Sequence, residues 1–104
     1  MKIVITSAGD QLSSAFDRRF GRAAWFCLLD EETGQTRFIK NEFEDAAQGA
    51  GRKVVEKVMG LGARKIISGD FGPKAQELLE QFNVQMIMID DDKTTVADII
   101  EKIK

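Results

Sequence analysis

The chain has 104 residues, of which 43% are hydrophobic and 31% are charged, and its formal net charge is -2. This length and composition predict one globular domain over residues 1–104. The acidic balance argues against a nucleic-acid partner, because binding to phosphate backbones requires a strongly basic face. With no apolar run of membrane-spanning length and no signal peptide, we expect a cytoplasmic protein without a membrane partner.

The residue types available for chemistry are restricted. The chain has no histidine and one cysteine, Cys27. A Cys/His zinc site, a cluster held by four cysteines and a catalytic pair that uses histidine are therefore excluded within one chain. The apolar neighbours of Cys27 predict a buried, unreactive thiol, which leaves carboxylates, lysines, arginines and backbone amides.

Short apolar runs bounded by turn residues predict five strands, two of which form a hairpin around a loop that contains Gly34. They lie at 2–6, 25–30, 36–40, 64–68 and 84–90.

Apolar residues at helical spacing predict three helices. The first extends from Ala47 to Met59, the second begins with Pro73 in its first turn, and the third covers 96–103. Thr95 and Asp98 resemble a capping box at the start of the third helix.

This element order predicts a three-layer α/β fold with helices on both faces of a mixed sheet. With strands numbered along the chain, right-handed crossovers favour the order 3-2-1-4-5, in which only the second strand is antiparallel. Ligands of such sheets bind beyond the carboxyl ends of the parallel strands. Four polar, glycine-bearing segments converge at that edge: 7–10, 18–22, 42–53 and 68–74.

The stretch "DRRFGRA" carries the densest basic cluster of the chain. Arg18, Arg19 and Arg22 have the planar, bidentate donors that suit a multivalent anion. The alternative is a solvated turn whose arginines pair with Asp10, Asp17 or nearby glutamates. If the loop binds an anion, Arg22 is expected to contribute most, because the following strand fixes its backbone while Arg18 and Arg19 lie in a freer loop.

Two further glycine-bearing stretches precede helices. "SGDFGPKA" presents backbone amides, a helix N-terminus and Lys74. "QGAGR" presents the same features, with Arg52 as the basic residue. The alternatives are a plain strand–helix connection for the first and a tightly packed helix entry for the second.

Carboxylates at strand ends indicate a different class of function. Asp10, Asp70 and Asp90–Asp92 fall on the same edge, and paired carboxylates there could hold Mg²⁺ for phosphoryl transfer. Ordinary turn chemistry is the alternative explanation for these aspartates.

The stretches "FDRRFGRAAWFCLLDEETGQ", "QGAG", "SGDFGPKAQELL" and "TTVADII", together with Asn41, resemble the NifX/NifY/NifB-C-terminal family in order along nearly the whole chain. That family is the dinitrogenase iron–molybdenum cofactor biosynthesis domain. The resemblance implies a ribonuclease H-like α/β fold and a small non-enzymatic domain that binds or carries an anionic metal–sulfur cluster, such as an iron–sulfur or molybdenum–iron–sulfur cluster, or its precursor.

Family members often carry histidine where this chain has Gln48, so capture by charge and hydrogen bonds is expected instead of ligation by histidine. Cofactor-assembly proteins are the implied protein partners. A magnesium-dependent phosphoryl-transfer enzyme using Asp10 and Asp70, or a regulatory adaptor that binds another protein, are the alternatives. The predicted binding residues are Arg18, Gly21, Arg22, Asn41, Gly49, Gly51, Arg52, Gly69, Gly72 and Lys74.

Overall fold

The computed structural model describes residues 1–91 and 93–104, so Asp92 of the predicted aspartate run lies outside the described residues. The elements, in chain order, are β1 (Lys2–Ser7), β2 (Trp25–Asp30), β3 (Thr36–Lys40), α1 (Ala50–Gly60), β4 (Ala63–Ser68), α2 (Pro73–Gln81), β5 (Gln85–Met88) and α3 (Val96–Ile103).

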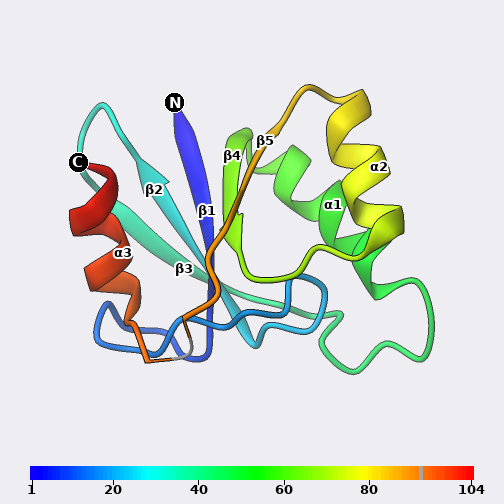
Figure 1. Cartoon of the computed structure of the whole chain (residues 1–104), viewed down its shortest axis with the longest axis horizontal. Helices are drawn as coiled ribbons and strands as arrows, with labels where there is room; N and C mark the ends of the chain where they lie inside the picture. The colour runs from blue at the N-terminus through cyan, green and yellow to red at the C-terminus, as the bar shows by residue number, and fades with distance from the viewer. Residues whose placement is uncertain (92) are drawn as a thin grey trace.

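The five strands form one mixed sheet in the order β3-β2-β1-β4-β5. β2 is antiparallel to both β1 and β3, whereas β4 is parallel to β1 and to β5. Helices α1 and α2 lie on one side of the sheet and α3 on the other (Figure 1). The predicted three-layer topology is confirmed, and it is compatible with the ribonuclease H-like fold that the resemblance implies.

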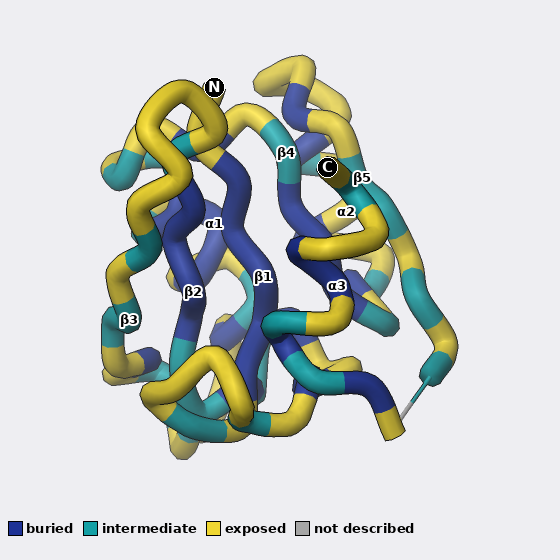
Figure 2. Tube along the Cα trace, turned by 90° about the vertical axis from the view of Figure 1, so that its left-hand side faces the viewer, coloured by how far each residue is buried: buried dark blue, intermediate teal, exposed yellow. Residues whose placement is uncertain are grey.

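Each face of the sheet has its own apolar cluster, as alternation along the strands requires. Phe26 packs with Val54 and Leu79 under α1 and α2. Its neighbour Cys27 points to the opposite face and packs with Ile99 under α3. Figure 2 shows the buried central strands β1, β2 and β4 between the more exposed edges.

Two elements were predicted too long. Helix α1 begins at Ala50 instead of Ala47, because Gly49 has a left-handed φ of 71° that cannot continue a helix. Strand β5 is limited to Gln85–Met88, four residues instead of the seven predicted. The capping box of α3 is confirmed, since Thr95 accepts from the amide of Asp98 and the Asp98 carboxylate accepts from the amide of Thr95.

The segment between β1 and β2 is fastened to the loop that follows β4. The carbonyl oxygen of Arg18 accepts from the amides of Gly69 and Asp70 at 3.1 and 2.7 Å, and the amide of Phe20 donates to Asp70 at 3.1 Å. Arg18 and Arg19 therefore do not lie in a freer loop, which corrects the expectation for this part of the backbone.

No helix among the described residues is long and apolar enough to cross a membrane.

Candidate functional site

A groove of about 680 Å³ opens where three of the four predicted segments meet. It is lined by residues 19–22 of the arginine loop, residues 49–52 at the entry to α1, and residues 70–75 between β4 and the first turn of α2. Seven of the ten predicted binding residues line it: Gly21, Arg22, Gly49, Gly51, Arg52, Gly72 and Lys74.

Glycines allow the arginine loop to approach the start of α1 closely. A Cβ atom on Gly21 would lie 3.1 Å from the amide nitrogen of Gly51 and 3.3 Å from its Cα atom. This is tighter than ordinary van der Waals contact, so a side chain at position 21 would push the two segments apart. The glycine thus brings the arginines beside the helix terminus.

Two helix N-termini face the groove. Gly49 precedes α1 and Gly72 precedes α2, and neither glycine has a side chain that can cap the first-turn amides. The first turns of both helices also lack an acidic residue, whereas the first turn of α3 contains Asp98. First-turn amides have no intrahelical acceptor and carry the positive end of the helix dipole, so these ends favour an anion.

The side chains of the groove add positive charge. Its lining contains four basic residues and one acidic residue, Asp70. The basic residues are Arg19, Arg22, Arg52 and Lys74. Arg19 and Arg52 each lie within ion-pair distance of a carboxylate, that of Asp17 and that of Glu56. The uncompensated positive charge of the groove therefore comes from Arg22, Lys74 and the two helix ends.

The two groove arginines of the loop differ in their partners. Arg19 donates from Nε and Nη2 to the buried carboxylate of Asp17 at 3.1 and 3.0 Å, and this bond raises the pKa of Arg19. Arg22 donates from Nη1 to the carbonyl oxygen of Glu44 at 3.0 Å and to that of Ala46. In the described part of the chain, neither Arg22 nor Lys74 forms an ion pair. Arg22 therefore brings an oriented charge that no carboxylate neutralises.

Arg18 and Gly69 lie in a neighbouring cavity of about 480 Å³ instead of the groove. Arg18 forms an ion pair with Asp90, and a Cβ on Gly69 would come within 2.4 Å of the Arg18 Cβ. The lining of this cavity contains two arginines and three aspartates, so it does not favour an anion. Arg19 pairs with Asp17, one of the partners that the paired-arginine alternative named, whereas Arg18 pairs with Asp90, which it did not name.

Asn41 is buried and lines neither cavity. Its Nδ2 donates to the carbonyl oxygens of Gly21 at 3.2 Å and Ala23 at 2.8 Å, and its Oδ1 accepts from the amide of Phe43 at 2.9 Å. The side chain fastens the arginine loop to the segment after β3. Its place in the site is that of a positioning residue.

Of the aspartates predicted as magnesium ligands, Asp70 and Asp90 line the second cavity together, where Asp90 forms its ion pair with Arg18. Asp70 lines both cavities, but Asp10 lines neither, and Asp91 accepts from the amide of Lys93 within its own turn. Within residues 1–91 and 93–104 there is no group of three histidine, cysteine or acidic side chains that could hold a metal ion.

Cys27 is fully buried, and desolvation raises the pKa of its thiol to about 11. The predicted burial is confirmed. The protonated thiol is a poor metal ligand and lies within the core under α3.

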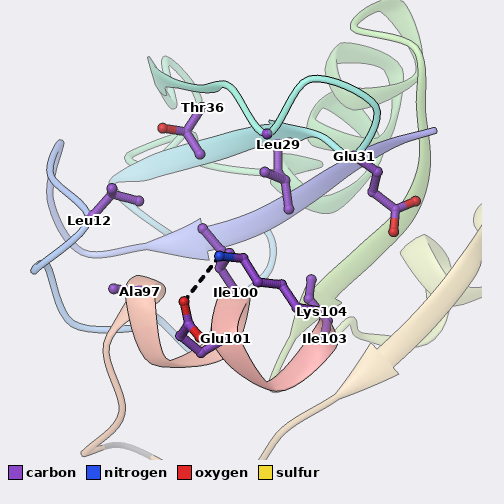
Figure 3. Close-up of a pocket in the computed structure, with 10 residues that line it drawn as sticks. Leu12, Leu29, Glu31, Thr36, Ala97, Ile100, Glu101, Ile103 and Lys104 are labelled. Carbon is purple, nitrogen blue, oxygen red and sulfur yellow. Dashed lines mark hydrogen bonds and ion pairs between the residues drawn. The ribbon is translucent and has the colours of Figure 1, made fainter.

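A third cavity, of about 430 Å³, lies beside α3 (Figure 3). Leu12, Leu29, Ile100 and Ile103 form its apolar surface, and the ion pair of Lys104 with Glu101 lies at its rim. No predicted binding residue lines it. The convergence of charge and helix ends therefore assigns the candidate site to the groove.

Sequence reasoning left Arg19 and Asp70 out of the predicted binding set, although both line the groove. Arg19 belongs to the basic cluster that was recognised. For Asp70 the sequence indicates a candidate metal ligand, and no local pattern predicts that it lines the groove together with the arginines.

The fold and the site together define a class of protein. It is an α/β domain in which basic side chains and two uncapped helix ends converge at the carboxyl edge of a mixed sheet. The chain belongs to the dinitrogenase iron–molybdenum cofactor family, whose model matches residues 1–104. The resemblance to the NifX/NifY/NifB-C-terminal domains is confirmed.

Two solved structures each match 98% of this chain, and each match covers 85% of the chain in that solved structure. One is the apo form of the orange protein from Desulfovibrio gigas, with 28% identity and a TM-score of 0.90. The other is a NifB-like protein from Thermotoga in the DUF35 family, with 31% identity and a TM-score of 0.83. No curated protein matches the chain.

Proposed function

We propose that this protein is a small non-enzymatic domain that binds or carries an anionic metal–sulfur cluster, or its precursor, for iron–molybdenum-cofactor-type assembly in the cytoplasm. The observation that carries the proposal is the groove in which four basic side chains meet the open N-termini of α1 and α2. Family membership supports the class of cargo. The orange protein, whose solved structure is an apo form, supports a binding role for this architecture.

The donor set determines how such a cargo is held. The chain has no histidine, and its single cysteine is buried away from the groove. Sulfide or oxo atoms at the surface of the cargo would instead accept hydrogen bonds from guanidinium, ammonium and backbone N–H groups. This mode suits a preassembled anion that is taken up and released without breaking metal–protein bonds.

The proposal is tested by calorimetric titration with tetrathiomolybdate, a compact sulfur-bearing anion, at moderate ionic strength. The double variant Arg52→Gln/Lys74→Gln removes two charges from the groove. It should bind at least roughly tenfold more weakly than wild type, since two charge-assisted contacts are lost. The control Arg64→Gln/Lys102→Gln removes the same charge from exposed positions outside the groove and should bind like wild type.

Saturable binding by wild type that the groove variant weakens and the control preserves supports an anion carrier. The absence of saturable binding by wild type would contradict it. Equal weakening by both variants would show that net charge, and not the groove, attracts the anion.

A further inference from the structure

One acidic residue lines the basic groove. Asp70 is exposed and lines the groove together with Arg19, Arg22, Arg52 and Lys74. A negative charge at this place repels an anion and weakens the field of the basic side chains. A groove used only for charge attraction gains nothing from it.

The Asp70 side chain is also held in place. Its Oδ1 accepts from the amide of Gly72 at 3.0 Å, and its own amide and carbonyl oxygen are bonded to Arg18 and Phe20. Among the described residues, no hydrogen bond reaches Oδ2. The free oxygen is thus a preoriented acceptor in a residue that lines the anion site. Because the side chain is already held, little conformational entropy is lost when a ligand binds to it.

We propose that Asp70 is a specificity-determining residue that selects anions presenting one electropositive atom to Oδ2. This inference rests on the proposed anion-carrier function. The electropositive atom has two possible sources in the proposed cargo: a proton on a hydroxyl or hydrosulfide group, or an exposed metal ion of the cluster. Both turn the repulsion by Asp70 into attraction, while an anion with neither is penalised.

Selection of this kind is measured as the difference in binding affinity between two ligands that are otherwise similar. Sulfate and hydrogen phosphate at pH 8 are both tetrahedral dianions, but only hydrogen phosphate has a proton to donate. Tetrathiomolybdate with and without one equivalent of ferrous ion, under anaerobic conditions, forms a second pair that differs in an exposed metal.

The test compares wild type with Asp70→Asn in calorimetric titrations of all four ligands. Asparagine retains the oxygen that accepts from the Gly72 amide, so the loop geometry is preserved. It removes the charge and turns the second position into a donor. Asp10→Asn is the matched control, because it removes one exposed carboxylate that lines neither cavity.

For at least one pair, wild type should bind the member with the electropositive atom roughly tenfold more tightly than its partner, the value of one charge-assisted hydrogen bond or more. Asp70→Asn should lower that preference to about twofold or less, chiefly by binding the donor-free anion more tightly. Asp10→Asn should retain the wild-type preference. The pair that responds identifies the source of the electropositive atom.

If Asp70→Asn changes the affinity for every ligand by the same factor, Asp70 acts only through its charge and the inference is overturned while the carrier function stands. A preference that is absent from wild type, or retained by Asp70→Asn, overturns it in the same way. If neither wild type nor the variant binds any of the ligands, the carrier function itself is contradicted.

Discussion

Arg19 and Arg22 lie three positions apart in the same loop and line the same groove, yet their surroundings give their charges different roles. The guanidinium of Arg19 is neutralised by the buried carboxylate of Asp17. That of Arg22 is oriented by two uncharged carbonyl oxygens. The sequence suggested the greater importance of Arg22 from backbone order, but the structure supplies a different physical reason, which is charge compensation.

We therefore predict that Arg22→Ala weakens tetrathiomolybdate binding by about 1.5–3 kcal/mol, the usual contribution of a charged hydrogen bond. Arg19→Ala should cost clearly less, because the Arg19 guanidinium already donates two hydrogen bonds to Asp17 and has fewer free donors for an anion. The Asp17 carboxylate left behind lines the second cavity and not the groove. Dissociation constants of the two variants, measured at one ionic strength, decide the order. A larger effect of Arg19→Ala would mean that the anion lies toward the second cavity.

Two glycines outside the groove differ in what they tolerate. A Cβ on Gly69 would lie 2.8 Å from the Cα atom of Arg18, whereas a Cβ on Gly60 would meet nothing within 4 Å. Gly69→Ala should destabilise the fold by about 1–3 kcal/mol, because the arginine loop must move. Gly60→Ala, at the end of α1, should stabilise it by roughly 0.5–1 kcal/mol.

Urea denaturation of both glycine variants measures these changes. Gly60→Ala serves as the control for adding a methyl group to a glycine. Unchanged stability of Gly69→Ala would show that the close approach of the Arg18 backbone is not required by the fold.

At the scale of elements, periodicity and turn chemistry were sufficient to predict all eight elements and the strand order. They failed at the entry to α1, where Ala47 has the spacing of a helical residue but lies outside the helix. Arg22 binds the carbonyl oxygens of Glu44 and Ala46 from more than twenty positions away, and Gly49 has a positive φ. The local pattern of apolar residues carries no information about such long-range contacts, so it could not predict where α1 begins.

The same limit applies to the site. The glycines and basic residues of the groove follow from the rule that ligands bind at the carboxyl edge of the sheet. The ion pair of Arg18 with Asp90 joins positions 72 residues apart, and the bonds of Asn41 fasten two segments together. These partners decide which predicted residues face the groove, and only the folded chain defines them.

At the scale of the whole molecule, the two-sided core isolates Cys27 from solvent. Burial raises its pKa from 9.0 to about 11, so the folded state favours the protonated thiol. This contribution to stability is complete below pH 9 and is lost as the pH rises through 11. The free energy of unfolding should therefore decline over this interval, and less so in Cys27→Ala.

Urea titrations at successive pH values, carried out on wild type and Cys27→Ala, measure the difference. Labelling of the native protein with a thiol reagent gives an independent check and should be slow until the chain unfolds. Rapid stoichiometric labelling of the native protein would contradict the burial of this thiol.

Because Gly49 and Gly72 have no side chain that can cap a helix, the starts of α1 and α2 leave the empty protein with backbone donors that water must satisfy. An anion bound between them would serve as the missing cap for both helices at once. Loading and folding are then thermodynamically linked, and the gain in stability grows with the ratio of free ligand to its dissociation constant. The empty form would fray first at these two helix ends, so a protease or a hydrogen-exchange experiment would distinguish loaded from unloaded molecules without contact with the cargo itself.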